Sequence, residues 1–179
     1  AEITMRREYF DGLGYLREHL PGHEECFISR LWEILGTRES RRIVGRYTVT
    51  RDDVLAGAKF DDAIAQAVFF IDFHDSPPGT SIPYTLEYKQ KNIPPPGDWY
   101  EIPYRCLVPE NVRGLLVAGR CISCDRSALA SLRVMPTCMF LGQAAGTAAA
   151  MAAKQGITVD EVDGAAVKCA LGGDGWTYM

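Results

Sequence analysis

Apolar residues recur at helical spacing at the start of the chain. In residues 1–20 they are Ile3, Phe10, Leu13, Leu16 and Leu20. This three-to-four-residue spacing predicts a helix from Ala1 to Leu20, which Pro21-Gly22 ends. Residues 25–36 fit a strand and a helix equally well.

The middle of the chain shows two-residue alternation, which predicts strands with one buried face. The alternating segments are 43–50, 82–89 and 100–106, and the apolar run 68–74 predicts a further strand that ends on an acid and a histidine. We expect 82–89 and 100–106 to pair antiparallel at a sheet edge, because Pro83 and Pro103 cannot donate to a ladder. Thr50 is predicted to cap a short helix ending near Gly57, and residues 60–67 are predicted to form another.

A strand, a loop and a long helix are predicted near the C-terminus. Residues 114–120 include a short apolar run, and a helix is expected from Pro136 to Lys154, with Gly156 at its end. One side of this helix is small, and such a side can approach a sheet or another helix closely. It comprises Gly142, Ala145, Gly146, Ala149, Ala150 and Ala153. Thr158 and Glu161 fit a capping box for a last helix to about Leu171.

The turn into the long helix is the strongest candidate for a ligand site. A helix that starts at a proline presents backbone N–H groups and the positive end of its dipole. A strand–loop–helix of this kind places those groups beside a ligand, which favours a bound cofactor.

Composition narrows the class of protein. The chain has 179 residues, 47% hydrophobic and 23% charged, with a net charge of −4, as is typical of a soluble globular protein. Its basic residues are dispersed, which argues against a nucleic-acid partner. Residues 134–153 carry no charge, but their many alanines, Pro136 and Gln143 favour a buried core helix over a membrane span.

The six cysteines lie mostly inside apolar runs, which suits reduced, buried thiols in a cytoplasmic protein better than a disulfide framework. Cys121 and Cys124 form a single C-x-x-C. A redox or zinc role for this pair is the minor alternative, because no second C-x-x-C and no nearby histidine pair accompany it. We therefore predict no metal site.

Several segments together carry a family resemblance. The most specific are 120–123 (RCIS), 131–139 (SLRVMPTCM) and 141–150 (LGQAAGTAAA). Earlier in the chain, segments 38–45, 60–65, 71–74 and 102–107 are also similar to the family and occur in the family's order. They resemble the C-terminal portion of bacterial FAD-dependent oxidoreductases of the glutathione-reductase-like flavoprotein superfamily, over residues 35–171.

The resemblance implies FAD as the cofactor. In such flavoproteins the segment after the last strand of the FAD domain follows the ribityl chain and pyrophosphate, so Gly119 and Arg120 are binding candidates. The helix start would lie at the flavin N1–C2=O edge, where its dipole favours the negative charge of the reduced ring. The residues implied there are Arg133, Val134, Met135, Pro136 and Thr137.

The G-x-G-x-x-G βαβ unit with which family members begin is not found in this sequence. The resemblance therefore implies part of a longer flavoprotein, with a substrate-side region at 1–108 and the C-terminal part of a Rossmann-like FAD domain at 109–179. The expected fold is α/β (α+β as a fragment), with an antiparallel substrate-side sheet. We expect weak or absent FAD binding by this chain alone. We also expect the unpaired strand 115–118 to associate with another copy or with an N-terminal half.

The catalytic candidates are His74, Arg38 and Arg105, which could orient a small-molecule substrate near flavin N5. Arg38, Arg41 and Arg42 with Glu39 could bind a substrate carboxylate or form an ion-paired surface turn. His74 could equally be satisfied locally, and Arg105 could simply pack and pair. A second function class stays open: a non-catalytic binding domain on the same scaffold without a cofactor.

Overall fold

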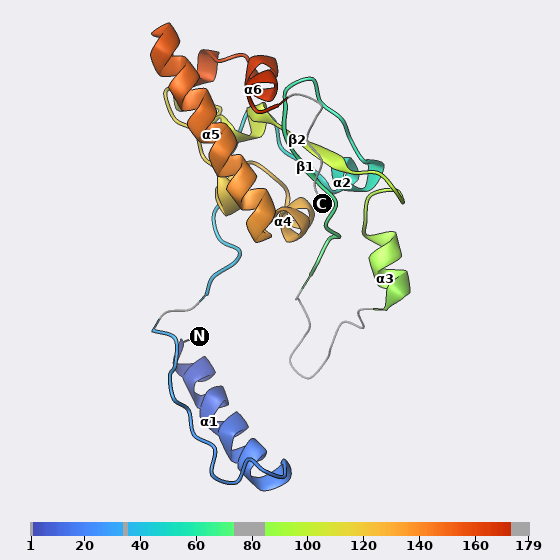
Figure 1. Ribbon diagram of the computed structural model, residues 1–179, viewed down its shortest axis with the longest axis vertical. Helices are drawn as coiled ribbons and strands as arrows, with labels where there is room; N and C mark the ends of the chain where they lie inside the picture. Colours follow the sequence, from blue (N-terminus) through green and yellow to red (C-terminus); the bar gives the residue numbers. More distant parts are fainter. Residues whose placement is uncertain (1, 34–35, 74–84, 173–179) are drawn as a thin grey trace. The chain divides into compact units, whose positions relative to one another are not determined.

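The computed structural model describes residues 2–33, 36–73 and 85–172 (Figure 1). It forms two compact units, Ala1–Thr37 and Arg38–Met179. The predicted division between residues 108 and 109 runs inside the second unit. His74 and Pro83, which carried sequence-based predictions, lie outside the described residues.

The first unit is built on helix α1 (Glu2–His19), which confirms the predicted first helix. Residues 25–33 form neither a helix nor a strand, and the Arg17 Nε donates to the Cys26 carbonyl at 2.8 Å, which ties this segment to α1. No described residue of this unit is buried. The unit therefore has no core of its own.

The second unit holds a two-stranded antiparallel sheet of β1 (Ala63–Ala67) and β2 (Tyr100–Pro103), with Ala65 opposite Ile102. Strand β1 occupies part of the segment 60–67, where we predicted a helix, and that prediction is wrong. Both faces of β1 are covered, since Ala63, Ile64, Ala65 and Ala67 are all buried. A strand buried on both faces loses the alternation that would have identified it.

The predicted strand 82–89 is wrong in its described part, because Leu86–Lys91 forms helix α3. The Thr85 hydroxyl caps the Tyr88 N–H, and Glu87 pairs with Lys91 one turn later at 2.6 Å. These local contacts favour a helix. The predicted pairing of 82–89 with 100–106 is therefore wrong as well, because a helix cannot pair in a sheet. Strand β2 is followed by a 3₁₀ turn, η1 (Tyr104–Leu107). Residues 68–73 form no strand, so the strand predicted over 68–74 is wrong in its described part.

Residues 43–50 do not form the predicted strand: within the described ranges they make isolated bridges, from Gly45 to Pro109 and from Val49 to Cys124, with a bend between them. A Cβ at Gly45 would lie 2.7 Å from the Ser123 Cβ, so the close approach of these segments requires glycine. Helix α2 (Arg51–Ala56) follows with the predicted Thr50 cap, and Gly57 ends it at φ 62°.

Three helices complete the second unit. Helix α4 (Arg126–Leu132), capped by Asp125, replaces part of the predicted loop. Helix α5 (Met135–Gln155) confirms the predicted long helix and ends at Gly156. The predicted last helix is divided into η3 (Val159–Glu161), where the Thr158 capping box closes, and α6 (Gly164–Ala170).

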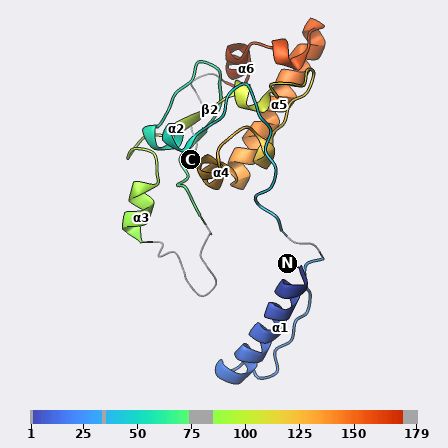
Figure 2. The same ribbon diagram turned by 180° about the vertical axis from the view of Figure 1, so that it is seen from behind.

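Helices α5 and α6 pack on β1. Figures 1 and 2 show α4 at the N-terminal end of α5 and α6 beside its C-terminal half. The buried face of α5 consists of Thr137, Leu141, Ala144, Ala148 and Ala152. Most of the small side predicted to approach another element is instead exposed in the described chain, namely Gly142, Gly146, Ala149, Ala150 and Ala153.

Residues 115–118 form no strand, which corrects the predicted C-terminal strand. The Val117 N–H donates to the Leu107 carbonyl at 2.9 Å, but no strand lies alongside among the described residues. A strand needs a ladder partner for its backbone groups, so an apolar run alone does not form one. No helix in the described ranges is both long and apolar enough to span a membrane.

Candidate functional site

The N-terminus of α5 is uncapped and open. Its N-cap residue, Val134, has no side-chain acceptor, and the first backbone bond runs from the Cys138 N–H to the Val134 carbonyl at 3.1 Å. The N–H groups of Met135 and Thr137 therefore have no partner within the helix. Met135 is 80% exposed and Pro136 is exposed, whereas Thr137 is buried, so the outer part of this helix end is open to solvent.

Arg133 lies directly before α5, and its side chain is only 9% exposed. Its Nη2 donates to the Asp72 carbonyl at 2.8 Å, and its Nη1 lies 3.5 Å from Glu39 Oε2. The guanidinium is thus held by two segments far away in sequence. A cation buried in this way is weakly screened by water and acts strongly on nearby charge.

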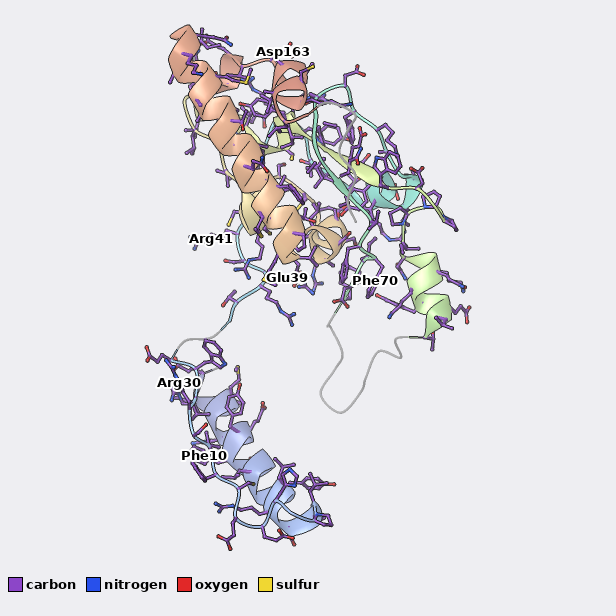
Figure 3. All side chains as sticks on the ribbon, in the orientation of Figure 1. Phe10, Arg30, Glu39, Arg41, Phe70 and Asp163 are labelled. Carbon is purple, nitrogen blue, oxygen red and sulfur yellow. The ribbon has the colours of Figure 1, made fainter. Side chains whose placement is uncertain are left out.

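Glu39 is the acidic partner at this position, and Figure 3 shows it beside the lower end of α5. Its Oε1 is buried, and no donor from the described residues reaches that oxygen. Sequence reasoning placed Glu39 in an arginine-rich turn but did not connect it with Arg133. The only sequence signal was that both residues belong to the segments carrying the family resemblance.

Gly119 and Arg120 lie in a 3₁₀ turn, η2 (Gly119–Cys121), that packs against α5. Gly119 has φ +77°, a backbone conformation that a side chain would strain, and Arg120 is exposed. The turn that holds Gly119 and Arg120 thus contacts the helix that begins at the other predicted cofactor residues. Arg38 is exposed next to Glu39 in the sequence. His74 lies outside the described residues.

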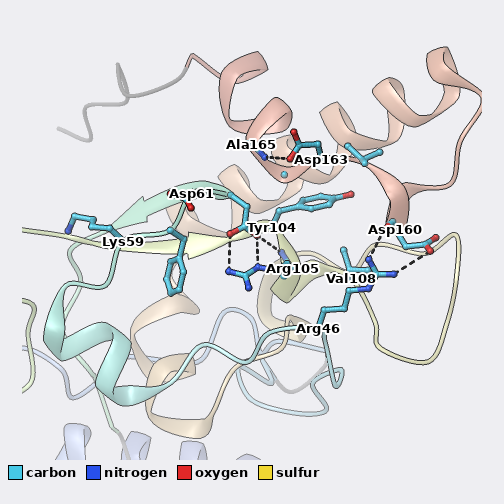
Figure 4. A pocket seen from close by; sticks show the side chains of 13 residues that line it. Arg46, Lys59, Asp61, Tyr104, Arg105, Val108, Asp160, Asp163 and Ala165 are labelled. Atoms are coloured by element: carbon cyan, nitrogen blue, oxygen red, sulfur yellow. Dashed lines mark hydrogen bonds and ion pairs between the residues drawn. The ribbon is translucent and has the colours of Figure 1, made fainter.

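Arg105 lies elsewhere, in a hollow of about 540 Å³ between η1 and the start of α6 (Figure 4). The hollow's lining includes none of residues 133–137. The Arg105 Nε and Nη2 reach both oxygens of Asp62 at 2.9 and 3.1 Å. This pair with Asp62 raises the pKa of Arg105 above its ordinary value.

Asp160 is the second charged centre of the hollow. Its carboxylate accepts from Arg113 Nε at 3.1 Å and from the Gly114 N–H at 3.0 Å, and its side chain is 4% exposed. The Thr158 hydroxyl, the Gly114 N–H and Arg113 hold the pKa of Asp160 well below its usual 3.8. These contacts join η3 to Arg113 and Gly114, so Asp160 stabilises the fold.

The C-x-x-C pair does not resemble a redox site. Cys121 is exposed, but Cys124 is buried, and burial raises the pKa of its thiol to about 12. A thiol exchanges through its thiolate, which Cys124 does not form near neutral pH. All six cysteines are unbridged, although only Cys106 and Cys124 are fully buried. Across the described ranges, no three potential metal ligands come together.

Comparison with known protein families bears on the choice between the two function classes. The family model for FAD dependent oxidoreductase matches residues 1–171. The chain belongs to the FAD dependent oxidoreductase family. No curated protein and no solved structure gave a match. The family binds FAD, so the relevant question for this chain is which residues could hold it.

The residues at the start of α5 fit such a cofactor. The uncapped N–H groups and Arg133 are donors near one helix end. The hollow at Arg105 fits less well, because the ion pairs of its arginines and aspartates are made within the chain.

Proposed function

We propose that this chain is part of a flavin-dependent oxidoreductase of the glutathione-reductase-like type that acts on a small-molecule substrate. In this proposal the start of α5 and Arg133 hold the flavin half of FAD. The observation that carries it is an accessible, uncapped helix N-terminus beside an arginine that is nine-tenths buried.

FAD supplies hydride and electron transfer when it is bound. The chain's own contribution is electrostatic. The N–H groups of Met135 and Thr137 and the α5 dipole favour negative charge placed at the helix end, by about 0.3–2 kcal/mol. Arg133 adds guanidinium N–H donors; its positive charge is balanced in part by Glu39, and Glu39 and the Asp72 carbonyl fix its direction.

The other predicted residues take supporting roles. Gly119 lets the backbone of η2 approach a ligand closely, and Arg120 presents an exposed cation from the same turn. Arg38, exposed beside Glu39, is the candidate for a substrate carboxylate. His74 and Arg105 remain sequence-based candidates on the substrate side, and a role for Arg105 requires its pair with Asp62 to open.

The proposal is tested by titrating FAD and FMN into the chain and following flavin fluorescence up to millimolar concentrations. FMN lacks the adenylate half, so it isolates the part of the site assigned to α5. We expect both to bind weakly and with similar affinity. Arg133→Met should weaken both by at least about tenfold, because a hydrogen bond from a charged group contributes roughly 1.5–3 kcal/mol.

Arg105→Met is the matched control, since it removes an arginine of the hollow. It should leave flavin affinity unchanged. Of the weak or absent FAD binding that the sequence predicts, the proposal commits to weak binding that is detectable at millimolar flavin. It fails if the unmodified chain binds neither flavin under those conditions, or if the two variants weaken binding equally.

A further inference from the structure

Two free cysteines lie where the turn η2 packs against helix α5. Cys121 is the last residue of η2, and Cys138 lies in the first turn of α5. Cys121 is exposed, Cys138 is half-buried, and neither is bridged. This pair differs from Cys121 and Cys124 in that its two members belong to different elements that contact each other.

The two thiols are close enough to act on one another. Burial raises the pKa of the Cys138 thiol, the neighbouring Arg120 acts against this rise, and the Cys121 thiolate adds to it. Two residues of η2 therefore lie beside Cys138, whose Sγ donates to the Leu132 carbonyl at 3.9 Å. A disulfide requires its two Cα atoms within about 7 Å, so elements packed in this way are where one can close.

A second pair of cysteines, Cys106 and Cys124, shows what distinguishes the pair at α5. These two residues are also neighbours, since Cys124 follows Ser123, whose N–H donates to the Cys106 carbonyl at 3.0 Å. Both are buried, and burial raises the pKa of both thiols. An oxidant in water is excluded from this pair, whereas it reaches the exposed Cys121 directly.

We propose that Cys121 and Cys138 are a peroxide-sensitive pair that forms a reversible disulfide between η2 and α5. The Cys121 thiolate attacks the peroxide: an S–O bond forms, the O–O bond breaks and hydroxide leaves, which gives a sulfenic acid. The Cys138 thiol then attacks the Cys121 sulfur, so that the S–S bond forms, the S–O bond breaks and water leaves. The two thiols together lose two electrons, and one peroxide is reduced to two waters.

The surroundings of the two sulfurs assign the order of the steps. Cys121 reacts first because it is exposed, and the half-buried Cys138 resolves the sulfenic acid. Arg120 favours the Cys138 thiolate that the second step uses. The bridge ties the turn that carries Gly119 to the helix, so the freedom of this turn depends on oxidation. The inference is independent of the proposed flavin function.

The first arm of the test uses the unmodified, fully reduced chain, so it does not depend on any variant folding. The protein is treated with a small excess of hydrogen peroxide, its remaining thiols are alkylated, and it is digested with trypsin. We expect mass spectrometry to find peptides 121–126 and 134–154 joined by a disulfide. Cys138 should be consumed as fast as Cys121 although it is less exposed, and dithiothreitol should restore both thiols.

The second arm uses three serine variants. Cys138→Ser should leave Cys121 as a sulfenic acid, which dimedone traps on peptide 121–126. Cys121→Ser should leave Cys138 unreactive toward peroxide, because the oxidised partner is missing. Cys124→Ser is the matched control: it removes the other cysteine of peptide 121–126 and should leave the rate and yield of the bridge unchanged.

Three results would overturn the proposal. The first is a folded chain that keeps both thiols under peroxide that oxidises free cysteine. The second is a bridge from Cys121 to Cys124 or to another chain in place of Cys138. The third is a bridge between Cys121 and Cys138 that forms only after the protein has been unfolded in urea, because the folded structure would then not bring the thiols together.

Discussion

The start of α5 and the hollow beside α6 both contain arginines with acidic partners, yet they are built differently. In the hollow, Arg105 is 49% exposed and closes a two-bond fork on Asp62. At α5, Arg133 is nine-tenths buried but its acidic partner is 3.5 Å away, and an oxygen of that partner has no donor among the described residues. The charges of the hollow are matched within the chain, whereas the contacts at the start of α5 leave one polar atom unmatched.

The largest expected effect is on the hollow, whose wall depends on Gly164. A Cβ there would lie 2.6 Å from the Asp62 Cβ and 2.9 Å from the Tyr104 Cβ. Gly164→Ala should therefore lower the free energy of unfolding by roughly 1–3 kcal/mol, measured by urea denaturation. Flavin affinity of the folded protein should not change.

Gly146→Ala is the control for that substitution. Gly146 lies within α5 with nothing within 4 Å of a built Cβ, so alanine should raise stability by about 0.5–1 kcal/mol through helix propensity. If Gly164→Ala also stabilised the protein, α6 would not pack as closely on η1 as the structure shows.

Acid should lower the stability of the folded protein through Asp160, which lines the hollow. Its pKa in the folded protein lies below the ordinary 3.8, so the ionised form stabilises the fold. This contribution is complete above about pH 5 and is lost as the pH falls through 3.8 and below. Asp160→Asn should lower the Tm at pH 7 and flatten the fall of Tm between pH 5 and pH 3. An equally steep fall in the variant would show that other carboxylates cause the acid sensitivity.

A smaller effect is expected at Arg105. Arg105→Gln should lower the free energy of unfolding by about 0.5–1 kcal/mol, because half-exposed ion pairs contribute little. A double-mutant cycle with Asp62→Asn should return most of that value as coupling energy. Loss of turnover or of flavin binding with full stability would instead support the sequence-based prediction that Arg105 is catalytic.

The elements predicted well from sequence are those with local signals. Thr50 begins α2 because its hydroxyl accepts from the Asp53 N–H, and Gly57 and Gly156 end their helices by adopting a left-handed backbone conformation. Strand β1 was predicted as a helix, because burial on both faces hides the alternation of a strand. Helix α3 was predicted as a strand, because its sequence alternates although Thr85 caps a helix there. Long-range packing decided β1, whereas local contacts decided α3.

The candidate site was predictable only where local signals mark it. Residues 133–137 were identified from the family resemblance and the helix start. The partnership of Glu39 with Arg133 spans almost a hundred positions, and no spacing rule relates them. The pairing of Arg105 with Asp62 also joins distant segments, so sequence alone could not separate a structural arginine from a ligand-facing one.

The most direct test of the account is a ¹⁵N–¹H spectrum of the chain titrated with FMN, which maps binding even when it is weak. The account predicts that the amide signals of Met135, Thr137 and Gly119 move most, and that those of Gly164 and Ala165 at the hollow stay in place. Shifts concentrated at Gly164 and Ala165, with Met135 and Thr137 unmoved, would contradict it.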